Sequence, residues 1–487
     1  MEHKNFAVAE NAHPLAGQNV VILGAGLAGL GAAYQLVRKG ITGVTVVEEQ
    51  EQVGGICGSF EFDGVYCDFG SHRLFPMLPD EIMRDLRRML GEDLIYQVRH
   101  GRILLQKRWI HFPLKPFDLI SRLPKSFIAG VLADKVRTVL ARDHSRSGTF
   151  SSVLECGLGR TMCRSFYFPY ARKIWGVEPD DLSVMAAQRR VSGSSVGKIL
   201  RKIASQLPGF KPSGTGHFYY PRHGYGQIAE CLYKEARKLG AEFKLGSRFI
   251  GIDRDGGRIT AMRYQMGGQA FVMPTKCVWS TIPINLLLQG MRPEPPGDIL
   301  EAASNIRYRG MILIYLLLDQ DRFGTSDAYY FPEEIIPISR LSEPKNFSRA
   351  TEPHGKTVLC AELPSDPESP EWGMSDEQLG GSLCDWLARV GLPVRARVSK
   401  VTTRRLRQAY PVYLRNYEEC FFKMDQWLGG IDGVLTFGRQ GLFAHDNTHH
   451  VLPVAYAAVA CLSRDGKFDR VRWAEYRKEF QKHVVED

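Results

Sequence analysis

The sequence predicts an α/β protein built on a Rossmann-like domain. Two observations predict this fold class: an apolar run leads into a glycine-rich turn and helix, and a second β-rich run beyond that helix ends in an acid. The 487 residues are 44% hydrophobic and 24% charged, which is an ordinary globular composition. A disordered or fibrous protein is therefore excluded.

The first predicted strand, Val20–Leu23, runs directly into the glycine-rich turn. Gly24, Gly26 and Gly29 have the G-x-G-x-x-G spacing. In this pattern Gly24 permits the tight turn, Gly26 lets a pyrophosphate approach the backbone, and Gly29 allows the helix to pack closely on the strand. We expect a dinucleotide whose phosphates face the amides of the helix N-terminus; the alternative is a glycine-rich helix start without a ligand.

The second β-rich run, Thr42–Val47, ends in Glu48, which lies 19 residues after Gly29. An acid at this distance is typical of a residue that hydrogen-bonds the ribose hydroxyls. A second glycine pair, Gly54 and Gly55, follows a few residues later. A dehydrogenase that binds only a nicotinamide cofactor has no evident need for this pair.

The arrangement resembles the FAD-binding start of the amine oxidase and protoporphyrinogen oxidase superfamily. After the glycine pair, the pattern D-G-x-x-x-D-x-G-x-H runs from Asp63 to His72, and Ile56 stands where the family usually has Arg. The resemblance implies FAD as the cofactor and places His72 in a loop beneath the flavin ring. His72 is thus a candidate catalytic residue, for hydrogen bonding or proton transfer, and the alternative is a structural His that caps a turn.

Two segments resemble the substrate side of UDP-galactopyranose mutase and its relatives. They are WIHFPLKPFDLI, Trp109–Ile120, and FYFPYARKIWGVEPDDLS, Phe166–Ser183. The resemblance makes Tyr170, Arg172 and Trp175 candidates for substrate binding. Trp175 is expected either to stack on a uridine or to anchor the core.

Three residues in the later part of the chain are candidates for phosphate or sugar contacts. They are Arg340, Arg404 and Tyr410. The segments Tyr329–Ser348 and Ala409–Tyr413, which hold the first and the last of them, also look like the mutase relatives.

The superfamily resemblance continues in two segments that return the chain to the flavin. Tyr219–Ile252 reads as a loop, an amphipathic helix and a strand, and the backbone near Phe249 is implied to touch the adenine end. Phe437–Leu462 resembles the C-terminal FAD signature, in which Gly438 and Arg439 form a turn that points at the flavin. Arg439 is the second candidate catalytic residue. The helix that follows would face the flavin pyrimidine with its N-terminus and favour an anionic reduced flavin.

On this resemblance the FAD-binding domain is discontinuous and the substrate side is an inserted α+β domain. We expect the FAD-binding domain over residues 18–80, 215–285 and 425–465, with substrate-binding inserts at 81–214 and 286–424. Residues 1–17 are expected to form a loose N-terminal extension.

The positive charge of the chain is concentrated in the first insert. Between Arg99 and Lys202 there are 20 Lys and Arg against 7 Asp and Glu, while the whole chain carries a net charge of only +10. This excess predicts an anionic small-molecule substrate or an anionic membrane surface; the alternative is a solvated basic face. No nucleic-acid recognition module is present.

The segment Phe117–Leu140 is apolar and basic at helical spacing. It fits peripheral contact with anionic lipid, and the alternative is a helix whose apolar face lies in the core. The sequence has no membrane-spanning run, no secretory signal and no C-x-x-C pair, so we expect a cytoplasmic protein with reduced cysteines and no metal site. The oligomeric state and the electron acceptor stay open.

The favoured function is an FAD-dependent oxidoreductase that transfers hydride from a substrate C–H to the flavin, on a sugar nucleotide or polyprenyl-linked sugar. One alternative is a redox-neutral isomerase of the UDP-galactopyranose mutase kind that uses reduced FAD. The loop GSHRLFP lacks the second His of the bacterial mutases, which argues against it. A second alternative is a protoporphyrinogen oxidase-like desaturase, for which the basic insert is unsuited. The third is a non-catalytic flavin-binding protein. We expect the flavin to be bound non-covalently.

Overall fold

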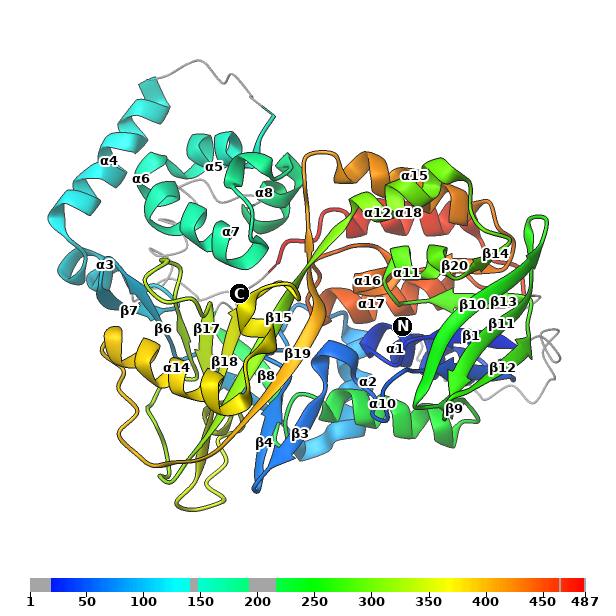
Figure 1. Cartoon of the computed structure of the whole chain (residues 1–487), viewed down its shortest axis with the longest axis horizontal. Coiled ribbons are helices and arrows are strands. Elements are labelled where there is room, and N and C mark those ends of the chain that lie inside the picture. Colours follow the sequence, from blue (N-terminus) through cyan, green and yellow to red (C-terminus); the bar gives the residue numbers. More distant parts are fainter. Residues whose placement is uncertain (1–18, 141–147, 192–215, 464–465, 486–487) are drawn as a thin grey trace, which may run out of the picture.

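The computed structural model describes residues 19–140, 148–191, 216–463 and 466–485. The expected loose extension over 1–17 lies outside these residues. A parallel sheet with its helices forms one part of the molecule, a large mixed sheet forms a second, and a helical lobe extends from the end of the molecule opposite strands β10 to β12 (Figure 1).

The parallel sheet has five strands, as the fold class predicts. Their order is β20 (Val434–Thr436), β13 (Cys277–Ser280), β1 (Val20–Leu23), β2 (Val44–Val47) and β9 (Glu242–Lys244). All neighbouring pairs are parallel, and every residue of β1 and β2 is buried. The sheet therefore draws its strands from three distant parts of the chain, while the exact domain limits stay a prediction.

Helix α1 (Leu27–Arg38) packs between the parallel sheet and two further helices, α10 (Gln227–Lys238) and α17 (Thr448–Ala460). The start of α1 approaches the strand so closely that only glycine fits. A Cβ on Gly29 would lie 1.9 Å from the carbonyl oxygen of Gly24, whose φ of +97° also favours glycine. The structure thus has Gly24 in the tight turn and Gly29 in the close helix–strand contact, as predicted.

A second sheet has four strands, which lie in the chain between β9 and β20 of the parallel sheet. Its order is β12 (Gln269–Pro274), β11 (Arg258–Met266), β10 (Ser247–Asp255) and β14 (Met291–Arg292). Strand β10 pairs antiparallel with β11 and parallel with β14. In Figure 1 this sheet forms a separate layer at the outer edge of the part that contains the parallel sheet.

The large mixed sheet has seven strands. Their order is β19 (Val398–Val412), β15 (Arg307–Leu318), β18 (Thr357–Pro364), β17 (Arg340–Ser342), β16 (Ala328–Tyr330), β6 (Gly101–Leu105) and β7 (Arg108–Phe112). All eight residues of β18 are buried, because α14 (Asp376–Arg389) covers one face and β3 (Ser59–Phe62) with β4 (Val65–Asp68) lies against the other. Strands from both expected inserts therefore meet in one sheet.

Within the described residues, the helices of the first insert that follow β7 form the helical lobe. They are α3 (Pro116–Arg122), α4 (Lys125–Leu140), α5 (Phe150–Leu158), α6 (Arg160–Met162), α7 (Phe168–Trp175) and α8 (Val184–Val191). The apolar and basic segment Phe117–Leu140 is not one helix: it breaks between α3 and α4 around Pro124, whose ring cannot continue α3.

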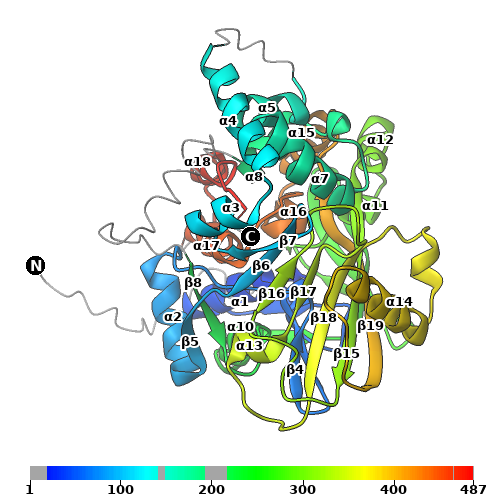
Figure 2. The same cartoon turned by 90° about the vertical axis from the view of Figure 1, so that its left-hand side faces the viewer.

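The remaining elements connect and cover these parts. They are α2 (Asp80–Leu90), β5 (Leu94–Val98) paired with β8 (His217–Pro221), α11 (Ile284–Gln289), α12 (Gly297–Asn305), α13 (Pro344–Ser348), α15 (Tyr417–Gly429), α16 (Gly438–Gly441) and α18 (Arg470–Phe480). Figure 2, turned by a quarter, shows the lobe standing above the large sheet. Among the described residues, no helix has the length and apolar character needed to cross a membrane.

Replacing Gly29 with Ala is expected to lower the free energy of unfolding by at least about 3 kcal/mol, because the new Cβ meets backbone that cannot move aside. Chemical denaturation of the two proteins measures this change. Gly381→Ala is the matched control: Gly381 is an exposed residue of α14 with nothing within 4 Å of an added Cβ, so alanine should stabilise the protein by about 0.5–1 kcal/mol. A Gly29→Ala protein as stable as the wild type would contradict the packing described.

Candidate active site

The N-terminus of α1 is open and has no side-chain cap. Gly26 is its N-cap residue, with extended backbone and no capping hydrogen bond. A Cβ added to Gly26 would meet nothing within 4 Å, whereas Gly54 and Gly55 lie directly beside it. Free amides that face an empty space bounded by glycine backbone make a site for a pyrophosphate.

Glu48 follows strand β2 and lies beside the same turn. Its Oε2 accepts a hydrogen bond from the backbone amide of Ala25 at 2.7 Å, and its Oε1 accepts one from the amide of Gln50 at 2.9 Å. Burial raises the pKa of Glu48, and these amides act against that shift. The carboxylate is therefore held at the end of the strand where a ribose is expected, and its contact with the ribose stays a prediction.

His72 joins two loops at the floor of the site. Its Nε2 donates to the carbonyl oxygens of Ile56, at 2.9 Å, and Phe69, at 3.0 Å. Its ring stacks on Tyr225 with centroids 5.2 Å apart, and burial lowers the pKa of His72. The hydrogen bonds of Nε2 are thus those of a structural His that caps a turn. A hydrogen bond from the neutral imidazole to flavin or substrate stays a prediction.

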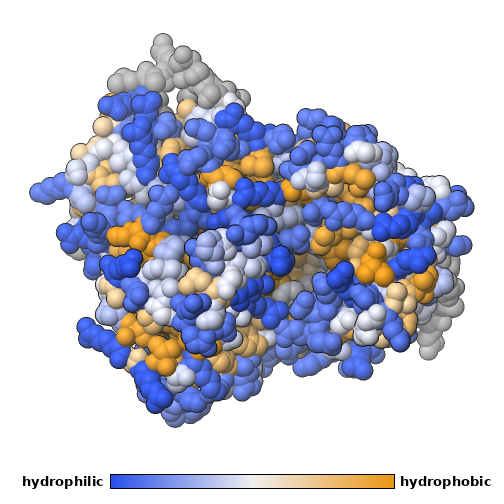
Figure 3. All heavy atoms as spheres, viewed as in Figure 1, coloured by the Kyte–Doolittle hydropathy of each residue, from blue (hydrophilic) through white to orange (hydrophobic). Residues whose placement is uncertain are grey.

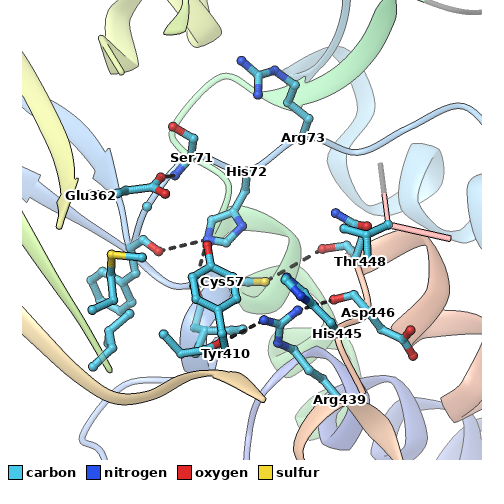
Figure 4. A pocket seen from close by; sticks show the side chains of 18 of the residues that line it. Cys57, Ser71, His72, Arg73, Glu362, Tyr410, Arg439, His445, Asp446 and Thr448 are labelled. Carbon is cyan, nitrogen blue, oxygen red and sulfur yellow. Dashed lines mark hydrogen bonds between the residues drawn. The ribbon is translucent and has the colours of Figure 1, made fainter. Parts of the chain in front are cut away.

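A pocket opens above His72 (Figure 4). It is lined by the turn at Ile56 and Cys57, the loop Gly70–Arg73, strands β15, β17, β18 and β19, and the N-terminal end of α17. Parts of the expected FAD-binding domain and of the expected second insert therefore face each other across one cavity. Arg73 points away from this cavity in Figure 4, and it forms a buried ion pair with Asp327 at 3.1 Å.

Arg439 lies at the wall of the pocket, in the short helix α16. Its Nη1 donates to the carbonyl oxygen of Asp446 and its Nη2 to that of Ala409, both at 2.8 Å. Its Nε is buried and has no hydrogen-bond partner within the described residues, and burial lowers the pKa of Arg439. Gly438, with φ of +75°, lets the turn approach α1: a Cβ there would lie 2.6 Å from that of Ala28.

Arg340 lies in the pocket but is not free to act as a lone cation. Its Nε and Nη2 each donate to Glu362 at 2.9 Å, and the two side chains are 15% and 4% exposed. Glu362 Oε1 also accepts from the backbone amide of Ser71 at 2.7 Å. Sequence reasoning missed Glu362, although an acid inside the apolar run of β18 was a visible signal.

Arg404 and Tyr410 lie on strand β19. The guanidinium carbon of Arg404 lies 3.6 Å from the ring centroid of Phe69; Phe69 lines the pocket, whereas Arg404 itself does not. Within the described part of the chain Arg404 has no acidic partner, and burial lowers its pKa. Tyr410 lines the pocket, with its ring 4.8 Å from that of His445 and 5.6 Å from the Arg439 guanidinium.

The candidates from the helical lobe do not line this pocket. Trp175 is only 3% exposed and packs edge-on against Phe150 in the core, with ring centroids 5.7 Å apart. The core-anchor alternative therefore describes Trp175, and its assignment to substrate binding is corrected. Arg172 pairs with Glu178 at 2.9 Å on the surface, and Tyr170 packs beside Phe166.

Phe249 lies on β10, where a bulge interrupts the pairing with β11. Its ring packs onto Gly290, so closely that a Cβ on that glycine would lie 2.6 Å from two ring carbons. The contact of the backbone near Phe249 with the adenine stays a prediction.

The start of α17 carries a group of imidazoles that sequence reasoning left without a function. His449 is 4% exposed, and neither of its ring nitrogens has a hydrogen-bond partner among the described residues. Asp446, His450 and His483 bring three potential ligand atoms within 4.8 Å of one another. The rings of His450 and His483 are stacked, 14° from parallel, so their in-plane lone pairs do not converge on one cation.

These observations fit the predicted cofactor. The open space at Gly26 suits a pyrophosphate, and the buried Nε of Arg439 and the first turn of α17 border the cavity where the resemblance places the flavin ring. The sequence model of the flavin-containing amine oxidoreductase family matches residues 27–419 of this chain. The chain belongs to this family.

Individual members of the family are more distant. The zeta-carotene-forming phytoene desaturase of Myxococcus xanthus is 22% identical over 413 residues, which are 77% of this chain and 78% of that protein. The crystal structure of a reduced UDP-galactopyranose mutase superposes with a TM-score of 0.77 at 22% identity, covering 91% of this chain and 93% of that one. Cyclohexylamine oxidase from Brevibacterium oxydans superposes with a TM-score of 0.62 at 14% identity, and the superposition covers 94% of this chain and 99% of that one.

The predictions of the superfamily, of the fold and of FAD as the cofactor are confirmed by the family match and these structural similarities. This flavin-containing amine oxidoreductase is an FAD-dependent enzyme. Its substrate class is not given by the family, because relatives with different substrates share the fold.

Gly26→Ala is expected to fold normally and to lose FAD. The added methyl group has space in the protein alone, but it would occupy the position where the pyrophosphate meets the backbone. FAD affinity should fall about tenfold or more. Fluorescence titration of the apoprotein with FAD measures it, with Gly381→Ala as the control, and unchanged affinity would show that the phosphates bind elsewhere.

Stability is expected to fall as the pH is lowered from 6.5 toward 4. Burial lowers the pKa of His449 to about 4, with the nearby His483 acting in the same direction. In this window the unfolded chain binds a proton at this residue that the folded chain does not, so folding loses up to about 3 kcal/mol. His449→Phe should flatten this dependence in urea unfolding, whereas His354→Gln, at an exposed position, should keep it. Equal slopes in all three proteins would contradict this assignment.

Proposed function

We propose that the enzyme oxidises an anionic, sugar-linked substrate, such as a sugar nucleotide or a polyprenyl-linked sugar, by transfer of a hydride to its flavin. The observation that carries this proposal is Arg404. Arg404 is not itself a lining residue, but its guanidinium lies over the ring of Phe69, which is one, and it has no acidic partner in the described structure. A half-buried cation without a counter-charge is costly, and a phosphate of the substrate would supply that charge.

The Arg340–Glu362 pair has a different function in this proposal. The bidentate pair is electrically balanced and is anchored to the loop amide of Ser71. It fixes the distance between strands β17 and β18 and the loop that carries His72. We therefore assign it to positioning the polar wall of the pocket, close to where sugar hydroxyls would lie.

FAD, when bound, supplies the acceptor for the hydride. The chain's own residues bind and orient the substrate. Arg439, held by two carbonyl oxygens with Nε unpaired, presents a fixed positive charge to the cavity. His72 is neutral, and its Nε2 proton is hydrogen-bonded to carbonyl oxygens. The imidazole ring is therefore held in place in the pocket wall, and only its Nδ1 can accept a proton.

A redox-neutral sugar mutase is the second candidate function. The structural similarity to reduced UDP-galactopyranose mutase over nine-tenths of the chain supports it. Against it, Phe75 stands where those mutases have a second His in the loop, and it packs edge-on against His449. A desaturase acting on an apolar substrate is supported by the similarity to the phytoene desaturase, and the charged pocket wall disfavours it.

Anaerobic titration of the oxidised enzyme with a panel of sugar nucleotides and polyprenyl-linked sugars tests the proposal. A substrate should bleach the visible absorption band of the oxidised flavin. If no sugar bleaches the band but the dithionite-reduced enzyme isomerises one of them, the mutase candidate replaces the proposal. Bleaching by an uncharged polyene or a porphyrinogen alone would replace it by the desaturase candidate.

Arg404→Gln should raise the KM or dissociation constant for the anionic substrate by about tenfold or more, with a smaller effect on the rate of flavin reduction at saturation. Stopped-flow reduction measures the two separately. Arg407→Gln is the matched control, since Arg407 is exposed on the same strand and lies over Trp372. An equal effect of the two variants would contradict an anion site at Arg404.

A further inference from the structure

Helix α4 packs against the lobe through a small and partly polar face. Phe127 is 7% exposed, and a Cβ on Gly130 would lie 2.8 Å from Oγ1 of Thr161 on the neighbouring helix α6. Asp134, one turn further on, accepts a hydrogen bond from the backbone amide of Thr161 at 2.6 Å. Positions 127, 130 and 134 therefore define the inner face of α4.

The opposite face of α4 is apolar and exposed. Leu132 and Val136, one turn apart, are each 58% exposed. Ala129 and Ala133 are also exposed and lie on the same side. Helix α4 therefore has apolar residues on two sides: Phe127 faces the core as in an ordinary surface helix, whereas this second group is exposed. The lipid-contact interpretation of the segment Phe117–Leu140 thus has an exposed surface to act through.

Exposed basic side chains lie on α4 and at the end of α3, which precedes it in the chain. Arg122 is 48% exposed and Arg137 76% exposed, and Lys125 is exposed between them. Their acidic neighbours, Asp118 and Asp134, are buried, with side chains 9% and 8% exposed. Helix α4 therefore carries an exposed cation near each end of its apolar face, in the region where Lys and Arg outnumber Asp and Glu by 20 to 7.

The position of α4 leaves this surface accessible. The helix lies at the outer edge of the lobe in both cartoon views (Figures 1 and 2). In the space-filling view, pale and orange residues stand among blue ones along that edge (Figure 3). A flat partner could therefore approach the edge without meeting the rest of the described molecule.

We propose that α4 docks the enzyme on an anionic lipid surface, with Leu132 and Val136 inserted at the headgroup boundary and the basic residues facing lipid phosphates. Apolar insertion and basic contacts together are what a helix lying in a membrane interface requires. A second copy of this chain is the less suitable occupant, because a symmetric contact would bring the same cations together. The inference does not depend on which substrate the enzyme oxidises.

Vesicle co-sedimentation of the full-length holoenzyme tests the proposal. Vesicles of phosphatidylcholine mixed with phosphatidylglycerol should bind the enzyme, more weakly as salt is raised, and vesicles of phosphatidylcholine alone should not. The double variant Leu132→Glu and Val136→Glu should reduce binding to the anionic vesicles by about tenfold or more. Its flavin spectrum and circular dichroism show that it is folded.

The matched control is Phe422→Glu combined with Val471→Glu. These two side chains are 62% and 74% exposed and lie on α15 and α18, not on α4, so the control adds the same charge and removes similar apolar surface. The control should bind like the wild type. Absence of binding to anionic vesicles, or equal binding by both double variants, would overturn the proposal. A dimer in solution that only the α4 variant dissolves would also overturn it, in favour of self-association.

Discussion

The structure depends on the close approach of helix α1 to strand β1. The carbonyl oxygen of Gly24 leaves no room for a side chain at Gly29, so the helix starts directly at the end of the strand with its amides uncapped. Helix α17 packs against the outer side of α1, close enough that a Cβ on Gly31 would lie 3.2 Å from that of Ala455. The close packing around α1 thereby aligns both ends of the cofactor site. One end is the glycine turn for the pyrophosphate, and the other is the start of α17, which borders the flavin cavity.

The parts that sequence reasoning predicted are those that local geometry requires. Glycine spacing, the acid after β2 and the turn at Gly438 each act within a few residues of the backbone they shape, so their pattern can be read without the fold. The five-stranded parallel sheet follows from the same segments. The family match then confirms FAD, which the pattern of segments implied.

The parts that could not be predicted depend on partners far apart in the chain. Arg340 was expected to meet substrate directly, but Glu362 on the neighbouring strand balances its charge. Trp175 belongs to a motif that resembles a substrate segment, yet its ring is needed to fill the core beside Phe150. In α4, spacing alone could not decide which face points outward, because apolar residues occur on both sides.

Buried charge sets the electrostatic character of the enzyme around this scaffold. Arg73 and Arg99 both donate to the hydroxyl of Tyr330, at 3.0 and 2.6 Å, and the surrounding cations lower the pKa of Tyr330 despite its burial. Asp327 supplies the matching carboxylate for Arg73. This cluster ties the flavin loop to the large sheet, so the pocket between them keeps its shape when a charged group enters.

The most direct test of the central claim is the flavin content of the purified protein, measured as absorbance released into the supernatant after acid precipitation. The structure predicts one FAD for each chain, released in full because it is bound without a covalent link. A protein with no flavin band would contradict the assignment of the glycine turn, Arg439 and α17 to one cofactor site. Flavin that stays with the precipitate would contradict non-covalent binding.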